Sequence, residues 1–403
     1  MRVLFLTTSY SPYVSGTATF AARQVSLLSS AGHVVGVVFP SPDGQARIIS
    51  HEADRSESQV QYQLRSFANP FRQNHRTFLV TPAEVKQVIR DFHPDIIHYN
   101  DPLLWPWVIA PWARAKGIKL VLTQHALAEY VALYFPVLKL GLSLIYAWWR
   151  WTLSQFDLIS VPSELMRRNV VETVGLRSVP VQVISNGVEL SRFRTQFSMK
   201  PVAKNLKFGS NFRPNSRRKV IRLLVVSRLD PEKSVAVLLK ALAQVSTQST
   251  TMNHVANHDW QLRIAGVGFL ESELRQLAKK LGIAKRVRFL GQVVGPTLVR
   301  QYHWADGFVI PAEAESQSIA TLEAMASGLP IIAANSGALP ELVKPGVNGW
   351  LFQAGSVADL ARCLKEFSDI GSKFGVASLK LVQTHSLDQI GKIWLQTYQD
   401  LVR

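Results

Sequence analysis

Short apolar runs alternate with helix-length segments along most of this chain, and this alternation constrains the fold more than any other feature. In the first half the runs are rich in Val, Ile and Leu and cover 3–8, 34–39, 96–99, 120–123, 158–161 and 181–185. Helix-length segments separate most of them, at 17–30, 82–92, 103–116 and 163–174. Runs that are apolar throughout predict strands buried on both faces, as in a parallel sheet covered by helices on both sides.

The same pattern restarts in the second half of the chain. Strand-like runs recur at 221–227, 261–265, 287–290, 307–310 and 330–334, with helical periodicity between them. We therefore predict an α/β fold of two doubly wound, Rossmann-like domains. The predicted domains cover 1–190 and 220–386, and a C-terminal helix near 387–403 completes the first. Residues 45–75 are polar and irregular and receive no assignment.

A basic segment lies between the predicted domains. Residues 191–219 contain nine Lys or Arg, no Asp or Glu, and scattered Pro, Gly and Asn. That composition is typical of a solvated linker rather than of a core element. In doubly wound sheets, ligands bind beyond the carboxyl ends of the strands, so we expect the functional residues in the loops that follow strands.

Charge and cysteine content narrow the function classes. The 403 residues include 45 Lys or Arg and 28 Asp or Glu, a formal net charge of +17, which favours an anionic partner: nucleic acid, anionic lipid or a phosphate-bearing substrate. The single cysteine, Cys363, excludes an intrachain disulfide framework and a multi-cysteine zinc site. It fits a reducing compartment, and the apolar run after Arg2 is too short for a signal peptide, so we expect a cytoplasmic protein.

The segment after the predicted strand 307–310 carries two glutamates, Glu315 and Glu323, eight positions apart. A helix that began near Ser316 would bring both toward one face, two turns apart. The spacing by itself is weak, because a chain with this many glutamates contains such pairs by chance. The preceding strand and the small residues that follow Glu323 make this pair a better candidate site than others.

A second candidate follows the predicted strand 221–227. Arg228 and Lys233 flank the turn that leads into a helix, where positive side chains and helix N–H groups can clamp a diphosphate. The alternative is an ordinary surface turn with a solvated lysine. Gly266 and Gly268 follow another strand and permit a close backbone approach, although a lone Gly-x-Gly is a weak signal.

Taken together, these segments resemble the retaining, family 4 (group 1) glycosyltransferases of the GT-B fold. In the second half the matching motifs are 227–233 (SRLDPEK), 315–330 (ESQSIATLEAMASGLP), 337–341 (GALPE) and 348–352 (NGWLF). In the first half they are 13–16 (YVSG), 97–98 (IH), 123–125 (TQH), 161–163 (VPS) and 186–193 (NGVELSRF). The resemblance covers nearly the whole chain and implies two domains that face each other across a cleft.

The resemblance also implies roles for individual residues. Arg228 and Lys233 would hold the diphosphate of a UDP- or GDP-sugar, and Glu323 would accept hydrogen bonds from the ribose hydroxyls. Around the transferred sugar it places Glu315, the backbone of Ser316, Gln317, Ser318 and Ile319, and His125 of the first domain. Alternatively, His125 is a structural histidine at the end of a strand. We interpret His98, at the end of another strand, as structural.

Gly16 would let the first loop approach the donor and acceptor. The family usually has paired glycines in that loop and before the later glutamate, whereas here Ser15 precedes Gly16 and Ala338 follows Gly337. No Asp-x-Asp occurs anywhere in the chain, so we expect no cofactor and no bound divalent metal. The phosphate that leaves would take the proton of the acceptor, and no protein nucleophile is required.

The acceptor is suggested by residues 128–156, where Trp148, Trp149 and Trp151 stand among apolar residues with Lys139 and Arg150. The stretch between the two cations is too short to span a bilayer but suits an interfacial helix. The alternative is a helix hairpin buried against the first sheet. With the basic linker, the interfacial interpretation predicts a peripheral protein on the cytoplasmic face of an anionic membrane and a lipid or lipid-linked acceptor.

The sequence is also compatible with three other functions. A transferase with a soluble or polysaccharide acceptor would carry the same donor motifs, and a sugar-nucleotide epimerase shares the two-domain architecture but needs no acceptor. A non-catalytic nucleic-acid-binding protein would explain the charge. Apart from Phe193, Phe197, Phe208 and Phe212, the basic linker lacks the interleaved aromatic and basic residues of a base-stacking surface, so we expect no nucleic-acid partner.

Overall fold

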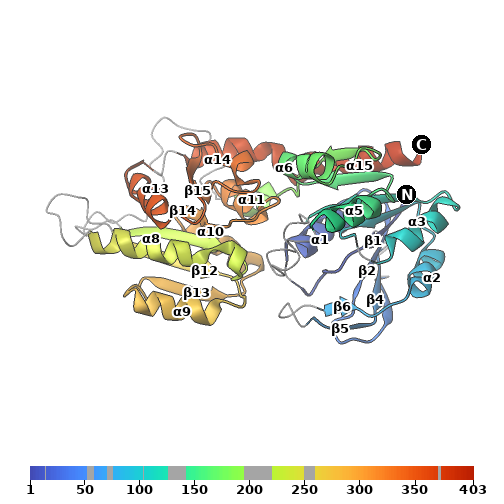
Figure 1. Ribbon diagram of the computed structural model, residues 1–403, viewed down its shortest axis with the longest axis horizontal. Helices are drawn as coiled ribbons and strands as arrows, with labels where there is room; N and C mark the ends of the chain where they lie inside the picture. The colour runs from blue at the N-terminus through green and yellow to red at the C-terminus, as the bar shows by residue number, and fades with distance from the viewer. Residues whose placement is uncertain are drawn as a thin grey trace. The chain divides into compact units, whose positions relative to one another are not determined.

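The computed structural model describes residues 1–13, 15–51, 59–69, 76–102, 104–125, 142–194, 220–248, 259–370 and 374–403. The chain divides into two compact units, one of residues 1–186 with 388–403 and one of residues 187–387. Each unit holds its own, mostly parallel sheet with helices around it (Figure 1). The predicted α/β class is confirmed.

The sheet of the first unit has the order β10-β9-β8-β7-β1-β2-β4-β3. Its strands are β1 (Arg2–Leu6), β2 (Val34–Pro40), β3 (Arg47–His51), β4 (Gln59–Leu64), β7 (Ile96–Tyr99), β8 (Lys119–Thr123), β9 (Leu158–Val161) and β10 (Val181–Val183). All neighbours are parallel except β3 and β4. The strand order reverses between β1 and β7, so the chain leaves these two strands in opposite directions. Such a reversal opens a crevice at the carboxyl ends of the strands.

Alternate residues of β1 point to opposite faces of this sheet, and each face has its own core. Val3 and Phe5 pack with α1 (Gly16–Ser30) and with α15 (Leu387–Val402). Leu4 and Leu6 pack with the helices of the other face, which are α2 (Pro82–Phe92), α3 (Pro106–Arg114), α5 (Leu142–Leu153) and α6 (Glu164–Arg168). The apolar strand pattern follows from this double coverage, because neither face of the strand meets water.

The second sheet has the order β13-β12-β11-β14-β15-β16 and is parallel throughout. Its strands are β11 (Val220–Val226), β12 (Asp259–Ala265), β13 (Val287–Gly291), β14 (Gly307–Ile310), β15 (Ile331–Ala334) and β16 (Gly349–Phe352). Its helices are α7 (Leu190–Phe193), α8 (Val235–Gln248), α9 (Glu271–Lys280), α10 (Gly295–Trp304), α11 (Ile319–Ala326), α12 (Leu339–Leu342), α13 (Val357–Ile370) and α14 (Gly375–Leu381). Here the strand order reverses between β11 and β14.

The linker prediction is wrong at its start. The second unit begins at Gly187, before the predicted end of the first domain at residue 190, and both Val188 and Phe193, the latter in the predicted linker, are buried in its core. Phe193 packs edge-on against the ring of Tyr302 in α10, so apolar burial draws this end of the basic segment into the domain. The rest of the predicted linker, residues 195–219, lies outside the described residues.

The unassigned region, residues 45–75, contains strands that the apolar pattern could not reveal. β4 reads QVQYQL and β3 joins it as an antiparallel edge strand. A short hairpin follows, made of β5 (Ser66–Ala68) and β6 (Arg76–Phe78). Strands at a sheet edge are covered on fewer sides, so polar residues are tolerated there.

The segment 128–156 is described from Leu142 onward, and residues 128–141 lie outside the described residues. The buried alternative holds for one face of α5, and the other face is exposed, so the interfacial interpretation stays a prediction. Tyr146, Trp149 and Leu153 pack against the core of the first unit that contains Leu4 and Leu6. In contrast, Trp148 and Trp151 are 40% and 49% exposed. In the part of the chain that the structure describes, no helix combines the length and apolar character needed to cross a bilayer.

The C-terminal helix α15 belongs to the first unit from Asp388 onward, and in Figure 1 this red helix lies beside green elements of that unit. The Tyr398 hydroxyl lies 2.5 Å from Nδ1 of His98, and Nε2 of His98 lies 2.7 Å from the Thr123 hydroxyl. Both residues of the Tyr398–His98 pair are fully buried, and burial lowers the pKa of His98 to about 3, with proximity to His125 adding to the effect. His98 is therefore a neutral core residue that ties the last helix to the sheet.

We expect Tyr398→Phe to destabilise the first unit. The substitution keeps the ring but leaves Nδ1 of a buried imidazole without its partner, which should lower the free energy of unfolding by about 1–3 kcal/mol. Chemical denaturation of the full chain, followed by circular dichroism, measures this. Gln399→Ala, on the exposed side of the same helix, is the control and should stay within about 0.5 kcal/mol of the parent chain.

Candidate active site

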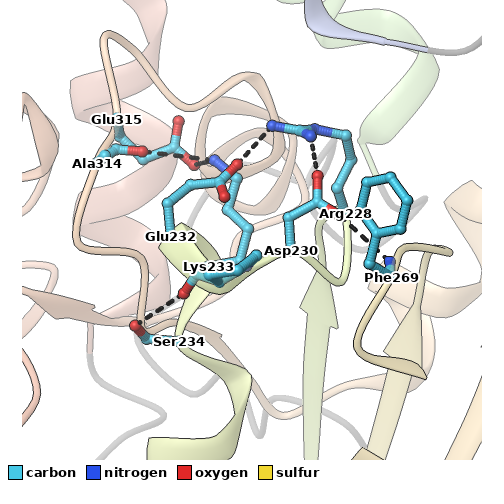
Figure 2. A network of polar contacts seen from close by, with 9 residues as sticks. Arg228, Asp230, Glu232, Lys233, Ser234, Phe269, Ala314 and Glu315 are labelled. Atoms are coloured by element: carbon cyan, nitrogen blue, oxygen red, sulfur yellow. Dashed lines mark hydrogen bonds and ion pairs between the residues drawn. The ribbon is translucent and has the colours of Figure 1, made fainter. Parts of the chain in front are cut away.

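The candidate site of the second unit lies where its strand order reverses. Residues 227–233 follow β11, and residues 311–318 follow the neighbouring strand β14. Because both segments leave the same edge of the sheet, the motifs around Arg228 and Glu315 come together although more than eighty residues separate them (Figure 2).

Lys233 and Glu315 form the closest link between the two segments. Lys233 ends a short 3-10 helix, Pro231–Lys233, and its Nζ lies 2.7 Å from Oε1 of Glu315. Both side chains are only 13% exposed. Figure 2 shows this pair beside the carbonyl of Ala314, which also accepts from Nζ at 3.5 Å. Removing water from an ion pair strengthens its field, so this lysine is a fixed cation at the edge of the sheet.

Arg228 is held by two carboxylates of its own turn. One guanidinium nitrogen bonds to Asp230, and the other lies 2.6 Å from Glu232. The side chains of the two acidic residues are 5% and 10% exposed, whereas that of Arg228 is 34% exposed. The guanidinium is therefore the most accessible group of this cluster. The sequence motif contained Asp230 and Glu232, but we assigned them no role. Their spacing at every second residue could have indicated that they position Arg228.

The predicted close approach at the glycine turn is observed. A Cβ atom on Gly266 would lie 1.8 Å from the carbonyl oxygen of Ser227, and one on Gly268 would lie 2.5 Å from the backbone nitrogen of Leu229. Gly266 also has a φ of +145°, which side chains rarely permit. The turn after β12 thus packs backbone against backbone on the Arg228 turn and fixes its course.

A third set of contacts fixes the loop after β14. The Ser234 hydroxyl donates to Glu313 at 2.7 Å, and the Ala338 N–H donates to the carbonyl of Glu315 at 2.9 Å. Gly337 has a φ of +55°, and a Cβ there would lie 2.5 Å from the same carbonyl, so only glycine fits. Ala338 has an ordinary φ of −88°. The alanine in place of the usual second glycine is therefore accommodated without strain.

The helix after Glu315 begins later than predicted. Ser318 is the N-cap of α11, its hydroxyl accepting from Thr321 N–H at 3.2 Å, and the helix starts at Ile319 rather than near Ser316. Glu315 therefore lies in the loop, and the argument that it shares a helix face with Glu323 is wrong. The hydroxyl of Ser318 competes for the backbone that an earlier helix start would need.

Glu323 is buried in α11 and has a partner that the sequence did not reveal. The Tyr302 hydroxyl, from α10, donates to Oε2 of Glu323 at 3.0 Å and lies 3.2 Å from the carbonyl of Ala320. Glu323 is 7% exposed. A buried carboxylate needs such a donor, and no local sequence signal links the two residues. Of the other predicted donor residues, Gln317 and Ser318 are buried, while Ser316 and Ile319 are partly exposed.

The predicted residues of the first unit are His125 and Gly16. His125 follows β8, its ring packs edge-on against Phe20 at 4.8 Å, and burial lowers its pKa to about 4. Its Nε2 atom is buried and has no hydrogen-bond partner among the residues that the structure describes. A buried ring nitrogen without a protein partner needs an explanation, and a bound ligand is one of those that apply to His125.

Gly16 is the first residue of α1, and Ser15 is its N-cap. The Ser15 hydroxyl accepts from Ala18 N–H at 3.0 Å and lies 2.9 Å from the Ser9 hydroxyl. The backbone of Ser15 is extended, with a φ of −152°. The serine that replaces a family glycine therefore fits its position and contributes a cap to the helix.

Comparisons with known families agree with this geometry. The family model of "Glycosyltransferase Family 4" matches residues 14–192, which include Gly16 and His125, and that of "Glycosyl transferases group 1" matches residues 210–373, which include Arg228, Lys233, Glu315 and Glu323. The chain belongs to the group 1 glycosyltransferases. It is therefore an enzyme, and the resemblance noted in the sequence is confirmed.

Two relatives of this glycosyltransferase have names that mention a sulfonated sugar or a lipid. The chain is 25% identical to sulfoquinovosyl transferase SQD2 of Arabidopsis thaliana over 75% of its own length and 55% of that protein. It is 26% identical to alpha-monoglucosyldiacylglycerol synthase of Streptococcus pneumoniae over 87% of its own length and 75% of that protein. The chain thus spans little more than half of the first relative.

Solved structures confirm the GT-B fold of this glycosyltransferase. The sucrose-phosphate synthase of Thermosynechococcus elongatus superposes with a TM-score of 0.78 at 19% identity and covers 99% of this chain and 98% of that one. The Anabaena protein Alr3699/HepE, solved in complex with UDP and glucose, superposes with a TM-score of 0.71 at 19% identity, with 99% of each chain covered.

The glycine turn offers a test of how the site is held. We expect Gly266→Ala to destabilise the second unit far more than Gly282→Ala. Both residues have positive φ, which costs an alanine about 1–2 kcal/mol, but only Gly266 faces backbone, whereas nothing lies within 4 Å of a Cβ on Gly282. The clash should add about 2 kcal/mol or more to the loss for Gly266→Ala. Equal losses in chemical denaturation would contradict the close approach.

Proposed function

We propose that this glycosyltransferase moves a sugar from a UDP- or GDP-sugar to a lipid or lipid-linked acceptor at a membrane surface, with retention at the anomeric carbon. The observation that carries the donor assignment is the pair of fixed cations, Arg228 and Lys233, at the reversal of strand order in the second unit. Ligands of doubly wound sheets bind at that position.

The carboxylates around the two cations explain how a diphosphate would be bound. Asp230 and Glu232 orient the guanidinium of Arg228, and Glu315 orients Lys233, before any ligand arrives. A diphosphate placed between the cations would add to these contacts or replace some of them. Buried Glu323 suits the ribose hydroxyls, because Tyr302 already fixes one of its oxygens. The UDP and glucose bound to the similar Anabaena protein support a nucleotide-sugar donor.

The chemistry of transfer needs this electrostatic arrangement. As the bond from the anomeric carbon to the diphosphate breaks, negative charge grows on the leaving phosphate, and preorganised cations stabilise it. The sugar becomes electron-poor, and Glu315 and the neutral His125 ring would assist it. In the proposed reaction the acceptor hydroxyl attacks from the face that the diphosphate leaves, and the phosphate takes its proton. No divalent metal takes part in this proposal.

Two observations support a lipid acceptor. The names of the relatives include a diacylglycerol glycoside synthase, matched over 87% of this chain. The chain also carries a net charge of +17, which favours attraction to an anionic membrane surface. The runner-up, a soluble or polysaccharide acceptor, uses the same donor site and differs only in the product.

A donor-by-acceptor screen tests the whole proposal. UDP- and GDP-sugars are offered with a lipid extract or with soluble glycans, in buffer with and without excess chelator, and products are identified by mass spectrometry and NMR. We expect a glycosylated lipid whose anomeric configuration matches that of the donor, formed equally well with chelator. A glycosylated soluble glycan, an inverted linkage or an epimerised donor without acceptor would each refute the corresponding part.

The two donor-site cations should be essential for turnover. We expect Arg228→Ala and Lys233→Ala each to lower kcat by about 10²–10³, because each removes one preorganised stabiliser of the leaving diphosphate. Steady-state kinetics with the donor identified in the screen measures this. Lys240→Ala, an exposed lysine of the adjacent helix α8, should leave kcat unchanged. Near-normal rates in both site variants, with the fold intact by circular dichroism, would refute the clamp.

His125 should act on the sugar rather than on the nucleotide. We expect His125→Ala to lower kcat by about 10² or more, the scale of a positioned group in the transition state. The affinity for the nucleoside diphosphate, measured by calorimetry, should change much less. A loss of affinity as large as the loss of kcat would remove His125 from this role.

A further inference from the structure

Five tryptophans gather on one side of the first unit, and only three of them come from the segment that the sequence singled out. Trp105 and Trp107 stand at the start of α3, and Trp148, Trp149 and Trp151 belong to α5. The ring of Trp107 lies 5.8 Å from that of Trp151, 6.3 Å from that of Trp148 and 5.8 Å from that of Trp105. The chain thus joins two distant segments into one aromatic surface.

The outer part of this surface faces solvent, although it is strongly apolar. Leu144, Trp148 and Trp151 have the spacing i, i+4 and i+7, so they form one stripe along α5, and they are 75%, 40% and 49% exposed. The opposite side of the same helix already supplies the contacts to the core. An exposed apolar stripe of this size on a protein surface marks an interaction site rather than core packing. We call Leu144, Trp105, Trp107, Trp148 and Trp151 the tryptophan face.

Charge indicates which kind of partner fits. Neither α3 nor α5 contains an Asp or Glu, and their only charged residues are Arg114 and Arg150. Lys116, just after α3, lies over the ring of Trp112 in α3 at 5.4 Å. Lys86 lies over the same ring at 5.8 Å, but its helix α2 also carries Glu84 and Asp91. Helices that bear tryptophans and cations but no carboxylates, as α3 and α5 do, are typical of the interface of an anionic bilayer.

Trp105 connects the tryptophan face to a cavity. A pocket of about 400 Å³ lies at the other reversal of strand order, between the carboxyl ends of β1 and β7, and Trp105 forms part of its wall. Leu104, also in the wall, and Trp105 both have a φ of 59°, a conformation that costs energy in residues other than glycine. The indole N–H of Trp105 donates to the Val80 carbonyl at 3.3 Å, which holds the ring in this strained position.

The pocket also presents one cation and one carboxylate, each held by hydrogen bonds. Arg76 of the β5–β6 hairpin donates to the hydroxyl and the carbonyl of Ser66 at 2.8 and 2.9 Å. Asp101 accepts from the N–H and hydroxyl of Thr8 at 3.2 and 2.6 Å. A guanidinium suits a phosphate, and a carboxylate suits hydroxyl groups. A headgroup that bears both would satisfy the two side chains together.

We propose that the tryptophan face lies in the interface of an anionic bilayer and that the pocket beside it receives the phosphate- and hydroxyl-bearing headgroup of a lipid in that bilayer. The proposal rests on the lipid acceptor of the proposed function and adds the surface and the pocket that would present this lipid. It gives Trp105 two neighbours, the bilayer on one side and the headgroup on the other.

Vesicle sedimentation of the full chain tests the tryptophan face. The probes are vesicles of phosphatidylcholine alone and vesicles with about one-third phosphatidylglycerol, in low and in high salt. We expect Trp148→Ser/Trp151→Ser to weaken the high-salt binding to phosphatidylglycerol vesicles by about tenfold or more, because apolar insertion does not depend on salt. Ile48→Ser, which removes an apolar side chain of the edge strand β3 that is 66% exposed, is the control and should change nothing. Unchanged binding in the double variant, with the fold intact, overturns the proposal.

The pocket is tested by headgroup preference. Vesicles with phosphatidylglycerol, whose headgroup has hydroxyls and a phosphate, are compared with vesicles of equal charge made with phosphatidic acid, which has no such hydroxyls. We expect the parent chain to bind the former several times more tightly, and Arg76→Gln and Asp101→Asn each to abolish the preference. Equal binding to both vesicles, or a preference unaffected by both substitutions, overturns the pocket assignment.

These measurements need no turnover, so they separate this inference from the proposed function. Tryptophan-dependent vesicle binding with the expected headgroup preference supports the inference even if the product screen finds a soluble acceptor, in which case the lipid-acceptor proposal alone fails. A glycosylated lipid product without tryptophan-dependent binding supports the proposed function and overturns the inference.

Discussion

The reversal of strand order in each parallel sheet is the constraint on which both candidate sites depend. Parallel strands point their carboxyl ends to the same edge of the sheet. Where the strand order reverses, the segments that follow the two neighbouring strands leave in opposite directions. In the second unit this occurs between β11 and β14, where Arg228, Lys233 and Glu315 meet. In the first unit it occurs between β1 and β7, beside the pocket with Asp101. Backbone topology therefore places the side chains of both candidate sites, and local contacts refine their positions.

Two kinds of local contact, ion pairs and close backbone packing, hold the two cations Arg228 and Lys233 in place. Carboxylates at every second position hold Arg228, and Glu315 holds Lys233 across the two loops. Behind them the backbone around Gly266 and Gly337 packs so closely that a side chain would collide with main-chain atoms. Partly buried ion pairs contribute little net stability, because the loss of hydration offsets the attraction. These ion pairs instead fix the orientation of the cations at the place where, in the proposed reaction, negative charge would develop.

Sequence patterns and structure differ where tertiary contacts decide. The buried strands, including β7 and β9, appear at the predicted residues, because a strand covered on both faces must be apolar throughout. The helix start at Ile319 was missed, because a serine hydroxyl capped the chain three residues after Glu315. The polar strand β4 was missed, because strands near a sheet edge need no apolar run. The partners of Glu323 and His98, Tyr302 and Tyr398, lie far away along the chain and leave no local signal.

The sequence by itself determined the α/β class, the repetition of the fold and the motifs of a group 1 glycosyltransferase, because periodicity and motif spacing are local properties of a chain. Only the tertiary structure decided which carboxylate pairs with which cation, that Phe193 belongs to the second core, and that Trp105 and Trp107 join the tryptophans of α5. These are contacts between residues distant in sequence. Their geometry depends on the register and order of strands, which no local pattern encodes.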